Sequence, residues 1–202
     1  MPHMRSDQSG SVVDEADHAR AQEYQLLAIL LAKAPDVDLL AGLAALRSDA
    51  SPLGLAHAAL REAAEAADCQ QVAREFFDLF VGLGRGELLP YGSYYLAGSL
   101  NDRPLALLRE DLARIGIVRA VGYAEPEDHA AVLCEIMAGL VDRRFDTPKG
   151  ADRDMFEKHF APWIGRFFAD LERAQAANFY RSVAAFGRQF VAIENEAFRL
   201  AE

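Results

Sequence analysis

Three acids and a histidine stand directly before an apolar run in the stretch "EPEDHAAVLCEIM", residues 125–137. The four side chains are those of Glu125, Glu127, Asp128 and His129. Carboxylates next to a histidine serve in general acid–base catalysis, in some metal sites and on surfaces that bind guanidinium groups. Acids are also common where a helix begins. The stretch therefore leaves four alternatives: a reactive site, a metal site, a docking surface or only a helix start.

The helix start explains part of the stretch. Pro126 fixes φ near the helical value and lacks the N–H that the first turn of a helix cannot use. Glu127 and Asp128 place negative charge near the positive end of the helix dipole. These residues predict a helix that begins at Pro126 and runs to about Arg143.

A helix start does not explain His129. On a helix of 3.6 residues per turn it shares one stripe with Leu133, Ile136 and Leu140. His129 should therefore lie at the N-terminal end of a buried face. A histidine in such a place is either a satisfied core residue or a functional one, and the sequence leaves both open.

Signatures of metal sites, nucleophiles and phosphate loops are weak. A di-iron helical bundle needs two Glu-x-x-His pairs, and the chain has a single one, Glu15 to His18. No HExxH or GxSxG occurs, and "GLGRGE" at 82–87 lacks the Lys-Ser/Thr of a P-loop. We therefore expect no metal and no required cofactor. A small helical enzyme or nucleotide-dependent switch that uses Asp128 and His129 remains the alternative.

Apolar residues recur at helical spacing, and the alternation of apolar and polar residues that marks a strand is scarce. This pattern predicts an all-α fold. The helices are expected near residues 17–33, 36–46, 53–67, 69–83, 101–115, 126–143, 152–160, 162–175 and 178–200. We expect a helical bundle of two blocks, 16–115 and 116–202, joined by a hinge near residues 116–126 and forming one compact unit. Residues 1–15 are expected to be a flexible tail.

An unusual loop is expected at residues 82–98, where five glycines and a proline stand among aromatics. Tyr91, Tyr94 and Tyr95 are too apolar to be left in water together, so the loop should be ordered. It lies in the first helical block, whereas the acidic stretch lies at the boundary between the two blocks.

Composition narrows the class of partner. The 202 residues are 51% hydrophobic and carry 31 acids against 21 bases, a formal net charge of −10. This charge disfavours a nucleic-acid partner and favours a basic one. The longest purely apolar run, residues 26–32, is too short to cross a bilayer, and no leader sequence opens the chain. We therefore expect a soluble cytoplasmic protein without stable membrane insertion, whose Cys69 and Cys134 are buried small hydrophobes.

Four stretches together resemble the TorD/DmsD family of cytoplasmic chaperones for molybdenum-cofactor oxidoreductases. They are "EFFDLFVG" at 75–82, "LLPYGSYYL" at 88–96, "EPEDHAAVLCEIM" at 125–137 and "HFAPWIGRFFADLERA" at 159–174. Each is weak alone, but they occur in the order of the family and span most of the chain from residue 75 to 180.

The resemblance implies a chaperone rather than a catalyst. Members of the family bind the twin-arginine signal peptide, or another part, of one apo-oxidoreductase and delay its export until the cofactor is inserted. The family binds its peptides at the acidic-histidine motif and the aromatic loop, and the matching residues here are Glu125, Pro126, Asp128, His129, Pro90, Tyr91, Ser93 and Tyr95. Family members often carry tryptophan where this chain has Tyr91.

The residues are chemically suited to that ligand. A twin-arginine leader has two guanidinium groups followed by a weakly apolar stretch, and its receptor needs carboxylates beside an apolar groove. Glu125, Glu127 and Asp128 are expected to supply the carboxylates. The groove should be lined by Tyr91, Tyr94, Tyr95, Leu133 and Ile136.

The expected partner is thus an apo-molybdoenzyme catalytic subunit or its leader. The sequence does not identify the client, and an interaction adaptor outside this pathway is a further alternative. We expect a monomer, with a domain-swapped dimer as the alternative. Some members of the family are linked to guanine nucleotides, but this chain has no phosphate loop.

Overall fold

The computed structural model describes residues 15–119 and 125–200 of the chain. Within these ranges the secondary structure is helical, and the β-type pairing is confined to one isolated bridge between Tyr91 and His129. The prediction of an all-α fold is confirmed.

The helices follow the expected order along the chain. They are α1 (Glu15–Ala32), α2 (Val37–Ala44), α3 (Pro52–Glu65), α4 (Cys69–Phe76), α5 (Gly92–Ala97), α6 (Arg103–Arg114), α7 (Ala130–Val141), α8 (Ala151–Met155), α9 (Ala161–Arg173) and α10 (Phe179–Leu200), with π-helical turns η1 (Phe77–Val81) and η2 (Phe156–Phe160). Side chains of short polar residues begin several of them, as their positions in the sequence predict. Ser51 accepts from the Gly54 N–H, and Asp68 accepts from the Gln71 N–H.

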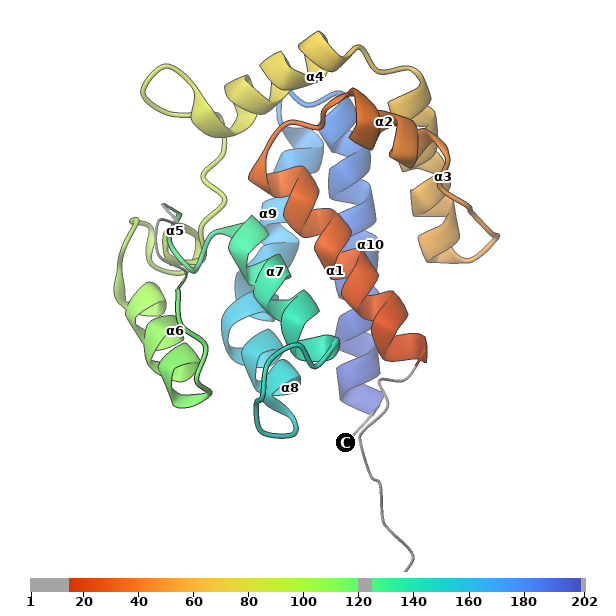
Figure 1. Ribbon diagram of the computed structural model, residues 1–202. Helices are drawn as coiled ribbons and strands as arrows, with labels where there is room; N and C mark the ends of the chain where they lie inside the picture. Colours follow the sequence, from red (N-terminus) through yellow and green to blue (C-terminus); the bar gives the residue numbers. More distant parts are fainter. Residues whose placement is uncertain (1–14, 120–124, 201–202) are drawn as a thin grey trace, which may run out of the picture.

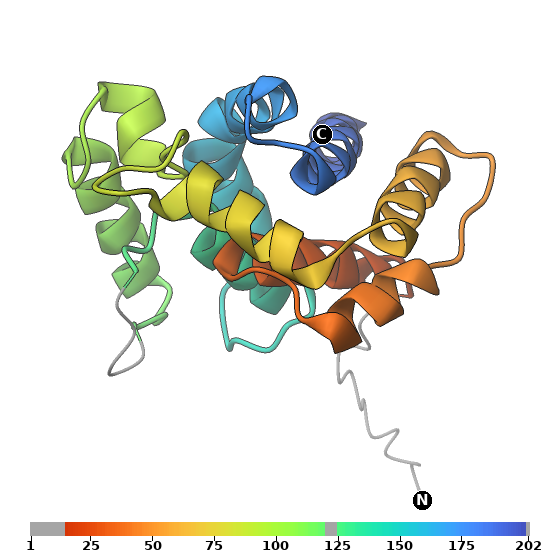
Figure 2. The ribbon, with the colours of Figure 1, turned by 90° about the horizontal axis from the view of Figure 1, so that it is seen from above.

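Residues from both ends of the chain build one core. The helix α1 packs along α7, and α10 packs against both α9 and α3 (Figure 1). The helix α4 crosses the N-terminal end of α10 (Figure 2). Several large aromatic side chains of α9 and α10 are fully buried in this core: Trp163, Phe167, Phe168, Phe186 and Phe190.

The helices α5 and α6 lie together on one side of the bundle (Figure 1). The first of them packs against α9. Farther along α6, Asp111 pairs with His159 of η2 at 2.7 Å. The ring of His159 thus joins α6 to η2.

Two further predictions need correction. The helix after the acidic stretch begins at Ala130, not at Pro126, because the His129 side chain caps it and residues 127–128 form a turn. The expected loop at 82–98 is interrupted by α5, whose six residues are too few to show a helical period. Residues 120–124 of the expected hinge lie outside the described residues, and the division into two blocks stays a prediction.

Cys134 is buried and Cys69 is partly buried, so neither is a freely exposed thiol. Burial raises the pKa of the Cys134 thiol and keeps it protonated. Among the described helices, none has the length and apolar character that a bilayer-spanning helix requires.

Candidate functional site

The aromatic loop and the acidic stretch are joined by backbone hydrogen bonds. The Gly92 N–H donates to the Asp128 carbonyl at 2.9 Å, and the Ala130 N–H donates to the Pro90 carbonyl at 2.8 Å. These two bonds frame the bridge between Tyr91 and His129. Two segments that were predicted separately therefore form one structural unit at the N-terminal end of α7.

Asp128 holds this unit together from inside. Its side chain is only 3% exposed, and its Oδ2 accepts a hydrogen bond of 2.7 Å from the Ser93 N–H in the first turn of α5. A carboxylate remote in sequence thus does what a local cap would do for α5. The other oxygen, Oδ1, and the Ser93 hydroxyl are buried, and no described residue donates to or accepts from them.

Gly92 allows the loop to lie this close to the core. A Cβ at this position would lie 3.0 Å from Nε1 of Trp163 and 3.2 Å from its Cε2. Such distances are tighter than normal side-chain packing, so a larger residue would push the loop away from α9. The indole donates to the His159 carbonyl at 2.8 Å, which fixes the surface on which the loop rests.

His129 caps α7. Its Nδ1 accepts from the Ala131 N–H at 3.1 Å, and its ring meets the Tyr91 ring edge to face, with centroids 5.0 Å apart. Burial lowers the pKa of His129 below its ordinary value, and the negative charges of Glu125 and Asp128, which act in the opposite direction, do not cancel this effect. The neutral ring is therefore favoured, as the cap requires, since a protonated Nδ1 cannot accept.

This cap makes stability depend on pH in a defined direction. Because the folded state lowers the pKa of His129, its contribution is fully present above about pH 6.5 and is lost as the pH falls through the folded pKa. Asparagine can cap a helix without titrating, so H129N should remove this part of the pH dependence. Urea unfolding at pH 7.5 and pH 5 should show that wild type loses stability relative to H129N. A difference that is the same at both pH values would contradict the assignment.

The exposed part of the unit consists of tyrosines and acids. The Tyr91 hydroxyl donates to Oε2 of Glu125 at 2.8 Å. Burial raises the pKa of the Tyr91 phenol, and the bond to Glu125 raises it further. Glu125 itself is exposed, so a carboxylate supported by a tyrosine stands at the surface.

Arginines and an acid from other helices contact two more residues of the unit, Glu127 and Tyr95. Arg109 on α6 donates from Nε to Oε2 of Glu127 at 2.8 Å. The Tyr95 hydroxyl donates to Asp170 on α9 at 3.1 Å, and Arg166 donates to the Tyr95 carbonyl at 2.7 Å.

The predicted site residues thus divide into two groups. Pro90, Ser93, Asp128 and His129 are buried and hold the two segments together. The other six are at least partly exposed and are the ones that a ligand can reach: Tyr91, Tyr94, Tyr95, Glu125, Pro126 and Glu127. The prediction that Leu133 and Ile136 line a groove was wrong, because both are buried in the core on α7.

Several contributors were not predicted. Arg109, Trp163, Arg166 and Asp170 reach the unit from α6 and α9, which lie outside both of its segments. The motif "HFAPWIGRFFADLERA" contains three of them and was the only available signal. Arg109 lies outside all four motifs, and only the packing of α6 brings it to Glu127.

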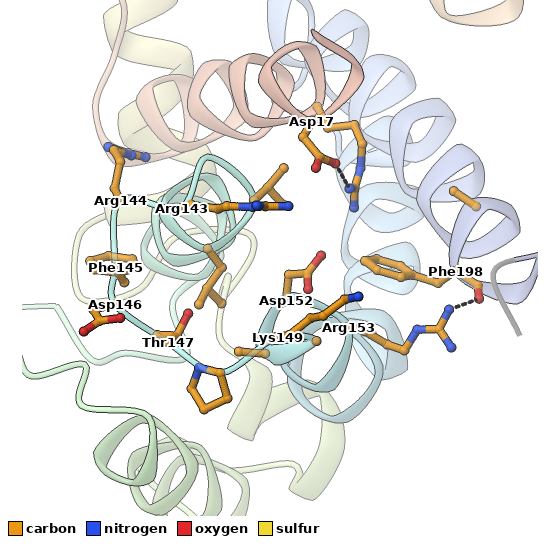
Figure 3. Close-up of a pocket in the computed structure, with 17 residues that line it drawn as sticks. Asp17, Arg143, Arg144, Phe145, Asp146, Thr147, Lys149, Asp152, Arg153 and Phe198 are labelled. Carbon is orange, nitrogen blue, oxygen red and sulfur yellow. Dashed lines mark hydrogen bonds and ion pairs between the residues drawn. The ribbon is translucent and has the colours of Figure 1, made fainter. Parts of the chain in front are cut away.

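A large hollow lies elsewhere, at the opposite end of α7 (Figure 3). It measures about 1090 Å³ and is lined by the ends of α1, α7 and α10 and by the turn before α8. Arg153 in this hollow donates to the Phe198 carbonyl, and Arg20 pairs with Asp17. Arg153 thus binds the C-terminal end of α10, and Arg20 is paired with an acid on its own helix. Over the described part of the chain, no cluster of three or more histidine, cysteine or acidic residues is placed to hold a metal ion.

Comparison with known proteins identifies the family. The sequence model of the nitrate reductase delta subunit family matches residues 46–169, more than half of the chain and all of the unit described above. The chaperone protein TorD of Vibrio cholerae serotype O1 is 28% identical over 130 residues, which are 60% of this chain and 59% of that relative. The TorD of Shewanella loihica is 25% identical over 208 residues, covering 90% of this chain and 94% of that protein.

A solved structure shares the fold. It belongs to a protein of Archaeoglobus fulgidus that is described as a redox enzyme maturation protein, with a TM-score of 0.51 and 20% identity. The similarity covers 95% of this chain and 99% of that one. The chain therefore belongs to the nitrate reductase delta subunit family, and its resemblance to TorD chaperones, predicted from four motifs, is confirmed.

Proposed function

We propose that the protein is a maturation chaperone for a molybdenum-cofactor oxidoreductase. It binds the twin-arginine signal peptide or the apo form of that enzyme in the cytoplasm and delays export until the cofactor is inserted. Its relatives are TorD chaperones, and the observation that carries the proposal is the joining of the aromatic loop to the acidic stretch. This joining places Tyr91 beside Glu125 at one accessible edge.

The accessible residues suit a basic leader with an apolar stretch. Carboxylates accept the forked hydrogen bonds of guanidinium groups, and Glu125 and Glu127 both lie at this edge. Tyrosine rings offer apolar area and a face for cations, and Tyr91, Tyr94 and Tyr95 are partly exposed next to the acids. The net charge of −10 attracts a basic segment over a longer range.

The burial of Asp128 and His129 argues against an enzyme at this site. A general base must reach its substrate, whereas Asp128 is 3% exposed and His129 is 8% exposed. Oδ2 of Asp128 accepts from the Ser93 N–H, and Nδ1 of His129 accepts from the Ala131 N–H. These groups shape the binding surface and act on the leader indirectly.

The test is calorimetric titration with a synthetic peptide that carries two adjacent arginines and a weakly apolar stretch. Binding near micromolar, about 8 kcal/mol, would suit a chaperone that must release its client. Replacement of the twin arginines by lysines should weaken binding, because an ammonium group cannot fork two hydrogen bonds to one carboxylate.

Y91A should weaken this binding about tenfold, since it removes both the ring and the support of Glu125. Tyr91 is partly exposed, so the melting temperature should change little. L55A, which changes an exposed side chain on α3, is the matched control and should bind as wild type does. Equal binding by wild type and Y91A would remove Tyr91 from the site.

A tagged protein recovered from its own organism under anaerobic growth should carry the client. Mass spectrometry should identify a molybdoenzyme catalytic subunit among the recovered proteins. Recovery of no such subunit while one is being made would count against the proposed function.

A further inference from the structure

Arginines of the chain itself occupy the surface assigned to the leader. The Arg85 guanidinium lies over the Tyr94 ring, 5.5 Å from its centroid, and donates to the Tyr94 hydroxyl at 3.2 Å. Arg166 lies over the Tyr95 ring at 5.8 Å. The tyrosines and acids of this surface are thus already suited to guanidinium groups, because internal ones use them.

The contact between Arg109 and Glu127 differs from these two because it uses a carboxylate. Nε of Arg109 lies 2.8 Å from Oε2 of Glu127. The Glu127 side chain is only 13% exposed, whereas that of Arg109 is 49% exposed. A largely buried carboxylate needs a cationic partner, but a half-exposed arginine can turn into solvent.

The helix that carries Arg109 does not depend on this contact for its position. Leu105, Leu108 and Leu112 bury the inner face of α6, and Asp111 pairs with His159 of η2. The Arg109 side chain can therefore leave Glu127 without displacement of α6.

We propose that Arg109 is an internal competitor for the leader: it occupies Glu127 in the free protein and is displaced by an arginine of the twin-arginine pair. This proposal rests on the proposed function. During the exchange Glu127 passes from one guanidinium to another, so its buried charge stays compensated. The contact with Arg109 is lost when the leader binds, which keeps the affinity modest and the release of the client easy.

Glu127 itself accounts for a selection for arginine over lysine. A leader lysine would replace the guanidinium with a compact and more strongly hydrated ammonium group. It would therefore bind Glu127 less well than a leader arginine does. Arg109 lowers the affinity for both leaders by the same factor and thus sets the strength of contact that a leader must exceed.

The test compares R109M with wild type by titration with the synthetic twin-arginine peptide and its twin-lysine counterpart. R109M should bind the twin-arginine peptide about three- to tenfold more tightly, because no internal guanidinium must be displaced. The affinity for the twin-lysine peptide should rise by the same factor, since displacement of Arg109 costs both peptides the same free energy. R103M, an exposed change on the same helix with the same change in charge, should bind within about twofold of wild type.

The effect must depend on Glu127. In an E127Q background the additional change R109M should leave peptide affinity unaltered, because Arg109 then has no carboxylate to occupy. A gain that persists in this background, or no gain in R109M alone, would overturn the proposal. If neither wild type nor R109M binds the peptide, the proposed function fails at this site, and the inference falls with it.

A measurement on the wild-type protein does not depend on the folding of a variant. The Nε–H signal of Arg109 in a ¹⁵N spectrum, assigned by its absence in R109M, should move toward the position of a solvated arginine when the peptide is added. A signal that stays unchanged at saturation would show that Arg109 keeps its contact with Glu127 and would refute displacement.

Discussion

Replacement of Arg20 by methionine should lower the free energy of unfolding by about 3–5 kcal/mol, because it leaves a buried carboxylate without a counter-charge. Glu194 on α10 is only 1% exposed. It accepts hydrogen bonds from Nε and Nη2 of Arg20 at 2.8 and 2.9 Å, and from the Tyr24 hydroxyl at 2.9 Å. Burial alone would lower the pKa of Arg20, but the interaction with Glu194 outweighs it and raises the pKa. The charged pair therefore persists within the contact between α1 and α10.

Urea unfolding at pH 7, followed by circular dichroism, measures this loss. R188M provides a matched control, since Arg188 on the same helix as Glu194 pairs with Glu172 at the exposed surface. Its loss should not exceed about 1 kcal/mol. Adding E194Q to R20M should restore part of the stability, because the uncompensated charge is removed. A loss in R20M no larger than that in R188M would contradict the role of the buried pair.

Replacement of Glu75 by alanine should lower the free energy of unfolding by about 3 kcal/mol, the second large effect. The Glu75 carboxylate accepts from three consecutive backbone N–H groups, those of Asn178, Phe179 and Tyr180, at 2.7 to 3.1 Å. These are the free donors at the N-terminal end of α10, and the negative charge also faces the positive end of the helix dipole. Without Glu75, the partly buried donors have no partner from α4.

Thermal and urea unfolding of E75A should be compared with E62A, which removes an exposed carboxylate from α3. E62A should change the free energy of unfolding by at most about 0.5 kcal/mol. E75Q keeps one acceptor oxygen and should lie between E75A and wild type. If E75A is as stable as E62A, water satisfies the α10 donors and the carboxylate is dispensable.

The same carboxylate connects the helical core to the aromatic loop. Glu75 lies on α4, which continues through η1 into the segment that carries Tyr91. Beyond η1, the Glu87 carboxylate accepts from the Gln175 and Ala176 N–H groups, just before α10. Both ends of η1 are therefore tied to the connection between α9 and α10. This arrangement leaves the loop little freedom before it reaches the acidic stretch.

The helices could be predicted from the sequence because their causes are local. Apolar residues at a period of 3.6 define a buried face, and Ser51, Asp68 and Pro104 mark helix starts by their own side chains. The start of α7 was misplaced for the same reason. Pro126 and the following acids satisfy every local criterion for a helix start, but the bonds from Gly92 and Ser93 to Asp128 hold this residue in a turn.

The candidate site could be predicted only in part. Residue types and the family motifs selected two segments that the structure brings together, and acids and tyrosines remain the accessible members. Which of them are buried could not be predicted, since the burial of Asp128 and His129 results from their pairing with a loop about 35 residues away. The contact between Arg109 and Glu127 could not be predicted either, because the spacing of residues in α6 does not indicate which element its exposed face will meet.

By itself, then, the sequence determined the helical class, most helix positions, the family and the two segments of the candidate site. The tertiary structure alone decided that Asp128 and His129 are buried while Glu125 and Glu127 remain accessible, and that Arg20 and Glu75 hold distant helices together. The physical reason is the range of the interactions. Periodicity, caps and turn residues act over a few positions, whereas burial and ion pairing depend on which helices meet after the chain has folded.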